Sequence, residues 1–451
     1  MPWTRRQQQQ LIDICNQNTS QPIYRLSPEL ISEIFLHGRP DVFAMRDADT
    51  WRKLVRYLVD ITSITGHLRR IALDYGELWS IVGFHVPRPD VNNYHKRALI
   101  VMEAFLERSR GRNLHFYFDD EYSAPSWFYP RLLALIIPHI GRAQTIGIWT
   151  SSNWKQLYVL LNNAVNINHL SLYTGGFGLP NPPTPPLNVL HNLKELTLYG
   201  IVYDESFHEI MGQVEKLDLA LFNTDLSKWL GSFIQLKWLR IHEIMHLAPG
   251  LTDSNILVRL ESLVHLDVSM SIYHSIAPRL SLPHLRHLNL RPPSVDPHLE
   301  PQYYRHPLLR TLSISLNMEH VHLLPVGMNP QLEYLEINLS NCLTPLSKLL
   351  WNPSQWPIPL TRAIIFPRPS LKYFRLIYTG RSDVPSDVDL WKRLRSILTK
   401  APHLKLDAVA QRAPPGFRGL KKQFPSQVKR YEGVDCVPLD ELYERSRKDN
   451  E

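Results

Sequence analysis

The stretch LVHLDVSMSIYHSIAPRLSLPHLRHLNL (residues 263–290) contains the same short pattern at both of its ends. The pattern is L-x-x-L-x-L, and its central leucines, Leu266 and Leu288, are 22 residues apart. Alternating apolar and polar side chains are typical of a strand with one buried face. A short strand that returns after such an interval indicates a leucine-rich repeat, whose period is about 20–29 residues.

The repeat continues in both directions from this stretch, with Ile, Val or Phe sometimes replacing Leu. The copies are AQTIGI (143–148), INHLSL (167–172), LKELTL (193–198), VEKLDL (214–219), LKWLRI (236–241), LVHLDV (263–268), LRHLNL (285–290), LRTLSI (309–314), LEYLEI (332–337) and LKYFRL (371–376). The last interval is longer than the others, 39 residues, and is expected to hold an insertion. In each copy the fourth and sixth positions point inward and stack on the same positions of the neighbouring copies.

These copies predict an α/β fold: an N-terminal module of three helices, followed by a curved leucine-rich-repeat solenoid with a parallel sheet on its concave side. The predicted parts are a flexible N-terminus (1–22), the helical domain (23–82), a connecting helical segment (83–112), the solenoid (113–406) and a basic, partly disordered tail (407–451). Residues 387–400 are expected to form a helix that caps the solenoid, because their apolar residues fall on one helical face.

The N-terminal stretch YRLSPELISEIFLHGRP (24–40) predicts a short helix. Ser27 can cap it, Pro28 suits the first helical position, Glu29 favours the positive end of the helix, and Gly38 can end it. Two further helical patterns follow, over residues 51–59 and 66–79. Three short helices have little core of their own, so part of their apolar surface is expected to contact a partner.

This module resembles an F-box. Its opening matches the pattern L-P-x-E-[LI]-[LW]-x-x-I-F through Leu26, Pro28, Glu29, Leu30, Ile34 and Phe35. The stretch LRRIALDYGELWSIV (68–82) is similar to the closing R-x-[IL]-A-x-x-P-x-L-W segment, with Gly76 in place of the proline. Where the family has V-C-[RK]-x-W, this chain has Ile64, Thr65 and Leu68. FLERSRGRNLHFYF (105–118) resembles the stretch that follows the F-box in fungal F-box proteins with irregular leucine-rich repeats.

The resemblance implies a substrate-recognition adaptor of an SCF-type (Skp–cullin–F-box) ubiquitin ligase, with no catalytic residue, metal or cofactor of its own. The six matching residues would contact the Skp-type adaptor, and through it a cullin–RING ligase, or would set the helix that does. The repeats would bind an unknown protein target for ubiquitylation. The departures from the family pattern leave an alternative open, a leucine-rich-repeat scaffold with a degenerate F-box and no ligase role.

The expected target-binding surface lies on the concave side of the sheet, where the third, fifth and seventh positions of each copy point. Aromatic side chains, arginines and both signs of charge recur there, which is the composition of binding hot spots. The candidate residues are Trp238, Arg240, His242, His265, Asp267, His287, Asn289, Arg291, Tyr334, Glu336, Tyr373 and Arg375.

One motif suggests a different function. HEIMH (242–246) has the H-E-x-x-H form of a zinc protease site, which needs both histidines on one helix. Here the motif begins where the strand LKWLRI ends, and Pro249 follows it closely. The sequence therefore favours a chance match, and a zinc hydrolase that uses HEIMH remains a remote alternative.

Composition narrows the partners. The net charge is +8, but the basic residues are spread along the chain and no aromatic-basic RNA motif accompanies them, so no nucleic acid is expected to bind. No apolar run is long enough to cross a membrane, and the N-terminus lacks the apolar core of a signal peptide. Cys15, Cys342 and Cys436 form no C-x-x-C pair. We therefore expect a cytoplasmic or nuclear protein, or one found in both compartments, without a membrane partner.

Overall fold

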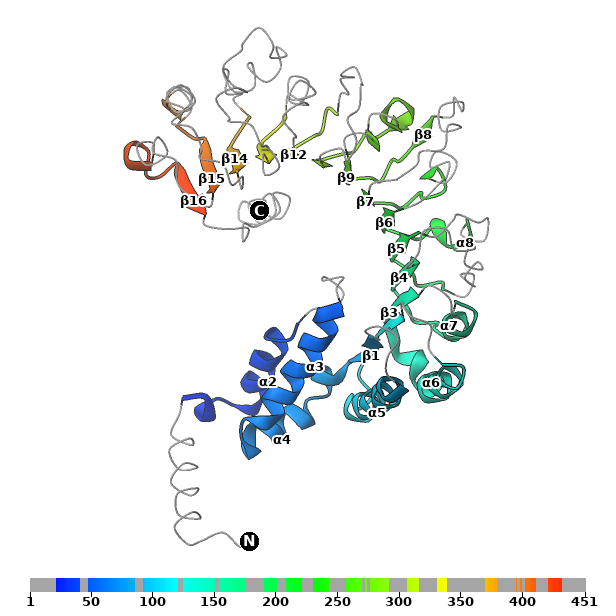
Figure 1. The fold of residues 1–451 in the computed structure, drawn as a ribbon. Coiled ribbons are helices and arrows are strands. Elements are labelled where there is room, and N and C mark those ends of the chain that lie inside the picture. Colours follow the sequence, from blue (N-terminus) through cyan, green and yellow to red (C-terminus); the bar gives the residue numbers. More distant parts are fainter. Residues whose placement is uncertain are drawn as a thin grey trace, which may run out of the picture. The chain divides into compact units, whose positions relative to one another are not determined.

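The structure is a computed structural model of the 451-residue chain. It describes residues 22–40, 48–85, 92–120, 125–150, 154–174, 190–200, 208–220, 230–242, 257–269, 272–273, 276–291, 306–315, 331–338, 370–378, 395, 398–399, 402–410 and 421–431. The chain divides into two compact units, Met1–Leu193 and Lys194–Glu451. Within the described ranges the fold is α/β and the paired strands are parallel (Figure 1).

The N-terminal unit begins with helices and continues as alternating strands and helices. Its helices are η1 (Pro22–Arg25), α2 (Pro28–His37), α3 (Ala48–Ser63), α4 (Gly66–Asp74), η2 (Gly76–Trp79), α5 (Asn92–Arg108), α6 (Phe128–Ile136), η3 (Ile137–Arg142) and α7 (Trp154–Leu161). Its strands are β1 (Ile81–His85), β2 (Leu114–Asp120), β3 (Ala143–Thr150) and β4 (His169–Thr174), in that order in the sheet. Helices α5, α6 and α7 lie along one side of these strands (Figure 1).

The first helix follows the sequence prediction at its start and differs at its end. Ser27 caps α2, since its Oγ accepts a hydrogen bond from the N–H of Leu30 at 3.4 Å. Gly38 ends the helix with φ −79°, so no left-handed turn requires a glycine. A Cβ at Gly38 would instead lie 2.7 Å from the hydroxyl of Tyr57, which donates to the carbonyl of Phe35. Gly38 therefore makes room for the contact between α2 and α3.

The helix predicted over 66–79 is interrupted. Thr65 caps α4, which ends at Asp74, and the 3-10 helix η2 follows. The indole of Trp79 folds back and donates to the carbonyl of Ala72 at 2.8 Å. A Cβ at Gly76 would lie 2.8 Å from the carbonyl oxygen of Ser109, so the close approach of the chain after α5 excludes a side chain at this position.

The sheet begins earlier than the sequence predicted. Strand β1 crosses the predicted domain boundary at residue 82, and Ile81 pairs with His115 of β2. Helices α2, α3 and α4 belong to the same compact unit as β1–β4, so this boundary does not separate two units. At Gly83 the backbones of β1 and β2 approach closely, because a Cβ there would lie 1.9 Å from the carbonyl oxygen of Tyr117.

A tight turn joins α5 to β2 within the stretch that resembles fungal F-box proteins. Arg110 and Gly111 have left-handed backbone conformations, with φ of 47° and 79°. Glycine adopts this conformation freely, whereas arginine adopts it only under constraint. The guanidinium of Arg110 is held at 2.6 Å from the carboxylate of Asp74, which ties this turn to the end of α4.

The C-terminal unit is dominated by one parallel sheet. Its main strands, in sheet order, are β5 (Glu195–Tyr199), β6 (Lys216–Ala220), β7 (Trp238–Ile241), β9 (His265–Ser269), β11 (His287–Arg291), β12 (Thr311–Ser315), β13 (Tyr334–Asn338), β14 (Tyr373–Tyr378), β15 (Lys405–Ala410) and β16 (Val428–Tyr431). The shorter elements are α8 (His208–Met211), η7 (Ala277–Arg279), and the paired strands β8 (Val258–Arg259) and β10 (Leu280–Ser281).

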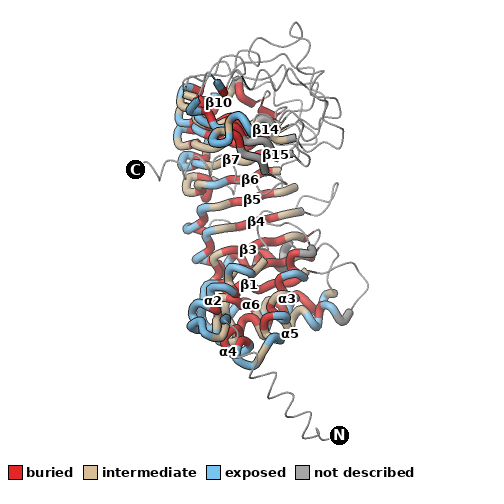
Figure 2. Tube along the Cα trace, turned by 90° about the vertical axis from the view of Figure 1, so that its left-hand side faces the viewer, coloured by how far each residue is buried: buried red, intermediate tan, exposed pale blue. Residues whose placement is uncertain are grey.

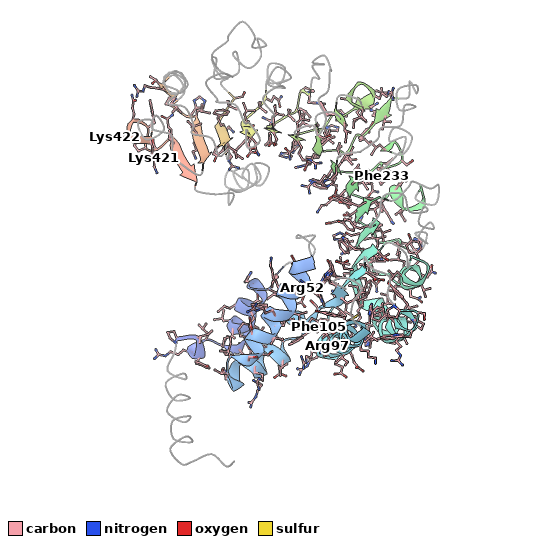
Figure 3. All side chains as sticks on the ribbon, in the orientation of Figure 1. Arg52, Arg97, Phe105, Phe233, Lys421 and Lys422 are labelled. Atoms are coloured by element: carbon pink, nitrogen blue, oxygen red, sulfur yellow. The ribbon has the colours of Figure 1, made fainter. Side chains whose placement is uncertain are left out.

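The central apolar residues of the copies pair across neighbouring strands and are buried, as the sequence predicted (Figure 2). This row consists of Leu196, Leu217, Leu239, Leu266, Leu288, Leu312, Leu335, Phe374, Leu406 and Val428. The long interval leaves the row unbroken, because Leu335 pairs directly with Phe374. Aromatic residues add to the core of each unit, such as Phe105 of α5 and Phe233 before β7 (Figure 3).

The predicted end of the repeats is wrong. Strand β15 continues past residue 406, and β16 lies wholly inside the segment 407–451 that was predicted to be a partly disordered tail. Of the segment 387–400, where the capping helix is expected, only residues 395, 398 and 399 are described, and these are helical; residues 1–21 and the three cysteines also lie outside the described residues. The buried side chains of Leu406 and Val428 explain why the sheet continues, since they extend the central row.

Candidate functional site

Helix α2 carries an exposed apolar stripe. Leu30 and Ile34 of α2 are 54% and 48% exposed and are four residues apart, so they lie on one side of the helix; Leu26, which precedes the capping residue Ser27, is 36% exposed. Ile31 and Phe35 are at most 4% exposed and face the core. We call Leu26, Leu30 and Ile34 the α2 stripe.

The other three predicted adaptor-binding residues have different roles in the structure. Phe35 is buried and fixes the helix rather than offering a contact surface. Pro28 and Glu29 are exposed in the first turn. The hydrogen bond between the side chains of Ser27 and Glu29 lowers the pKa of Glu29, so this carboxylate stays charged at the positive end of the helix.

The positions that depart from the F-box pattern lie beside the start of α2. The hydroxyl of Tyr24 donates to Oγ1 of Thr65 at 2.9 Å, which ties η1 to the beginning of α4. Ile64, the residue before Thr65, is exposed, and Leu68 is buried. An apolar side chain is therefore exposed at Ile64, whereas Thr65 caps α4 and binds Tyr24, and Leu68 packs in the core.

A row of aromatic rings runs across β2, β3 and β4 of the N-terminal unit. Trp51 of α3 stacks on Tyr117, Tyr117 contacts Trp149, and Trp149 stacks on Tyr173, with centroid distances of 6.0, 4.7 and 4.4 Å. Beside this row, Nδ1 of His85 lies 2.7 Å from the carboxylate of Asp119. This row was not predicted from the sequence, although the alternation in LHFYFD places Tyr117 opposite Phe116 and Phe118.

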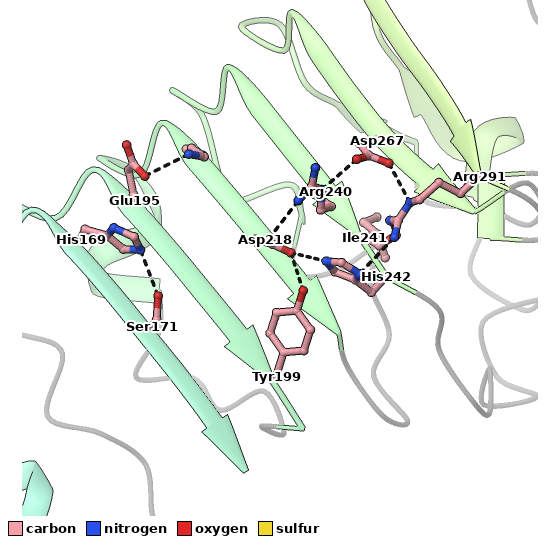
Figure 4. A network of polar contacts seen from close by, with 11 residues as sticks. His169, Ser171, Glu195, Tyr199, Asp218, Arg240, Ile241, His242, Asp267 and Arg291 are labelled. Carbon is pink, nitrogen blue, oxygen red and sulfur yellow. Dashed lines mark hydrogen bonds and ion pairs between the residues drawn. The ribbon is translucent and has the colours of Figure 1, made fainter. Parts of the chain in front are cut away.

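In the C-terminal unit, the third, fifth and seventh positions of the copies form what we call the polar face. Its most connected part lies on β5, β6, β7, β9 and β11 (Figure 4). The buried carboxylate of Asp267 binds Nε of Arg240 with one oxygen and Nε of Arg291 with the other, each at 2.8 Å. A second buried carboxylate, Asp218, lies 3.9 Å from Nη1 of Arg240. The two aspartates and two arginines balance in charge.

His242 belongs to this network through both of its ring nitrogens. Nε2 lies 2.9 Å from Asp218, and Nδ1 lies 3.0 Å from Nη1 of Arg291. Because a guanidinium can only donate, Nδ1 accepts from Arg291, and Nε2 faces the carboxylate of Asp218. In this arrangement neither nitrogen is available to a metal. Glu243 and His246 of HEIMH lie outside the described residues.

Trp238 lies beside this charged network and contacts both aromatic rings and cations. Trp238 contacts the ring of His265, which stacks on His287. Nζ of Lys216 and the guanidinium of Arg240 lie 5.2 and 5.0 Å from the centre of the Trp238 ring. The half-buried indole of Trp238 thus contacts two cations.

A second cluster lies on β12, β13 and β14. Glu336 accepts a hydrogen bond from Ser313 at 2.7 Å and lies 3.1 Å from the guanidinium of Arg375. Tyr334 and Tyr373 stack at 5.8 Å, and Arg375 lies over Tyr373. This cluster joins three neighbouring strands, but Arg375 is only 1% exposed.

Burial divides the predicted target-binding residues into two groups. Asp267, His287, Tyr334 and Arg375 are buried and serve the internal contacts of the face. Half-buried residues, which a partner can reach, are Trp238, Arg240, His242, His265, Asn289, Arg291, Glu336 and Tyr373. Tyr199, Lys216 and Asp218 were expected on this face from their positions in the copies but were not among the candidate binding residues. Their strand positions were the available signal, whereas their contacts depend on side chains about 20 residues away in sequence.

Among the residues that the structure describes, no group of three or more His, Cys, Asp or Glu side chains is arranged to hold a metal ion. None of the described helices combines the length and apolar character that spanning a membrane requires. Comparison with protein-family models finds no match to this chain, and comparison with curated proteins finds none either.

Proposed function

We propose that the protein is the target-recognition adaptor of an SCF-type ubiquitin ligase. Helices α2, α3 and α4 act as an F-box-like module that binds a Skp-type adaptor, and the strands that follow act as leucine-rich repeats that bind a protein target. The chain itself performs no catalytic step in this proposal, since other subunits of the ligase transfer ubiquitin.

The main support for adaptor binding is the exposure of the α2 stripe. A helix usually turns its apolar residues toward the core, whereas α2 has apolar residues on two sides and only Ile31 and Phe35 are buried. Contiguous exposed apolar residues on one side of a helix are typical of a protein interface. The residues of the stripe are also those that match the opening pattern of the F-box.

The regular parallel strands support the second half of the proposal. Ten copies of one apolar pattern coincide with strands, and the sheet face opposite their core carries half-buried aromatic and charged side chains. Repeat proteins use such faces as extended docking surfaces for other proteins. The same face would serve a scaffold protein without a ligase role, so only adaptor binding distinguishes the two functions.

The test is co-purification of the full chain with a Skp-type adaptor. We expect the wild type to retain the adaptor and Leu30→Lys/Ile34→Lys to lose it, because two charges would replace exposed apolar contacts. The matched control is Ile100→Lys/Val159→Lys, which places lysine at two exposed apolar positions on α5 and α7. The circular dichroism spectra of both variants should equal that of the wild type.

If the wild type binds no adaptor, or if the stripe variant and the control bind it equally well, the ligase role is wrong. The first result would favour a repeat scaffold with a degenerate F-box, in line with the departures at Thr65 and Leu68.

A further inference from the structure

We propose that Arg240 is the binding site for a carboxylate side chain of the target, an aspartate or glutamate in an exposed segment of that protein. This inference rests on the proposed role of the polar face in target binding. It adds the chemistry of the ligand and the residue that recognises it.

The guanidinium of Arg240 is already oriented before any partner binds. Its Nε is held at 2.8 Å by the buried carboxylate of Asp267, and its plane lies over the ring of Trp238 at 5.0 Å. The side chain is nevertheless 37% exposed. In the described part of the chain neither Nη1 nor Nη2 makes a hydrogen bond, and Nη1 lies 3.9 Å from an oxygen of Asp218 (Figure 4). The end of the fork is therefore free to bind an acceptor with two oxygens.

Arg291 has a different role from Arg240, although both bind Asp267. Its three nitrogens are all engaged, by Asp267, by Nδ1 of His242 and by the carbonyl of Ile241. Arg291 therefore fixes the far oxygen of Asp267 and keeps that carboxylate in position for Arg240. Of the two arginines, Arg240 is the one whose two terminal nitrogens make no hydrogen bond within the described residues.

The surroundings of Arg240 favour a single negative charge. Asp218 is buried beside Nη1 and carries a negative charge that an incoming anion would face. A phosphate dianion would meet about twice the repulsion that a carboxylate meets at the same distance, since Coulomb energy is proportional to charge. Lys216, the next cation, lies 3.1 Å from Glu195 and is already paired. The site thus has too little positive charge for a phosphorylated residue and suits a carboxylate.

The test uses the full chain and a peptide array in which each sequence appears in three versions, with glutamate, glutamine or phosphoserine at its centre. We expect binding to favour the glutamate versions. The strongest glutamate peptide is then labelled, and its affinity for the protein is measured by fluorescence anisotropy. Arg240→Gln should weaken this affinity about tenfold or more, as expected for the loss of a charge-assisted contact.

Arg310→Gln is the matched control. Arg310 is similarly exposed, at 35%, and also binds a carboxylate, that of Glu333 at 2.6 Å, but it precedes β12 and lies outside the polar face. We expect its affinity for the peptide to equal that of the wild type. Arg240→Lys keeps the charge without the fork and should also bind the peptide more weakly than the wild type does.

Three results would overturn the inference: no peptide preference for glutamate over glutamine, a preference for phosphoserine, or equal affinity of Arg240→Gln and the wild type. Adaptor co-purification is measured on the same preparations and does not depend on Arg240. If the adaptor is retained while the peptide result fails, only this inference is wrong, whereas loss of adaptor binding by the wild type contradicts the proposed function itself.

Discussion

Asp267 shares its two carboxylate oxygens between arginines of the two neighbouring strands, Arg240 of β7 and Arg291 of β11. It is only 2% exposed, so its charge is stabilised by these partners rather than by water. Each arginine keeps part of its side chain in solvent. The aspartate is therefore the member of the network whose removal is expected to matter most.

We predict that Asp267→Ala lowers the free energy of unfolding by about 2–3 kcal/mol, because two guanidinium groups lose their common partner. Water can reach both arginines, which places the loss at the lower end of the usual range for buried pairs. Urea unfolding monitored by circular dichroism measures the change. Glu195→Gln, which breaks an exposed pair with Lys216, should change stability by less than about 1 kcal/mol; equal losses in both variants would refute this account of Asp267.

His306 gives the stability of the C-terminal unit a dependence on pH. Burial lowers its pKa to about 4, and its Nε2 lies within hydrogen-bonding distance of the hydroxyl of Tyr273, at 2.6 Å. Above the unfolded pKa of about 6.5 the ring is neutral in both states and its full contribution is present. As the pH falls from about 6.5 to about 4, His306 becomes protonated in the unfolded state but stays neutral in the folded state. The free energy of unfolding therefore falls over this interval.

The predicted loss from this single histidine is about 3 kcal/mol over that interval. His306→Gln retains an acceptor for Tyr273 but cannot titrate. Urea unfolding at pH 7.5 and at pH 4.5 should therefore show a smaller drop for His306→Gln than for the wild type. His95, whose pKa burial also lowers, contributes equally to both proteins and cancels in the comparison. An identical drop in the two proteins would mean that His306 is not neutral in the folded state.

At the scale of the strands, the sequence predicted the centre of the sheet well and its two ends poorly. A copy such as LVHLDV identifies its strand because the alternation of leucines arises from burial on one face. Strand β1, IVGFH, is buried on almost every position and so lacks that alternation. Strand β16 is only four residues long, and no L-x-x-L-x-L copy marks it in the sequence.

The sequence predicts which residues lie on the polar face, but not which of their side chains are accessible to a partner. Arg240 and Asp267 both occupy the fifth position of their copies, yet Arg240 is half-buried and Asp267 is buried. That difference arises from Arg291, whose long side chain reaches back past Asp267 to the carbonyl of Ile241. Arg240, Asp267 and Arg291 belong to three different copies. The apolar pattern within one copy therefore cannot predict the contacts among them.

The pairing of β1 with β2 depends on Gly83. We predict that Gly83→Ala destabilises the protein by about 2–3 kcal/mol, because its Cβ would overlap the backbone of Tyr117 and the two strands would have to separate. Gly66→Ala is the control, since a Cβ there meets no atom within 4 Å. Thermal unfolding compares the two, and a melting temperature of Gly83→Ala equal to that of the control would contradict the close approach of these strands.

For the molecule as a whole, the extension of the sheet by β15 and β16 predicts how the chain tolerates truncation. A chain that ends at residue 400 would leave β14 as an unpaired edge and expose the apolar row beside Phe374, and we expect it to aggregate or to unfold at a lower temperature. A chain that ends at Tyr431 keeps both strands and is the control. Equal solubility and melting temperature for the two truncated chains would show that β15 and β16 are dispensable.

We propose that two surfaces, one in each unit, bind different proteins: the α2 stripe binds a Skp-type adaptor, and the polar face binds a target. The most direct measurement is calorimetric titration of the purified full chain with the adaptor, for the wild type, Leu30→Lys/Ile34→Lys and Arg240→Gln. We expect the wild type and Arg240→Gln to bind the adaptor with the same affinity, and Leu30→Lys/Ile34→Lys to bind it at least about a hundredfold more weakly. Absence of binding by the wild type, or unchanged binding by the stripe variant, would contradict this proposal.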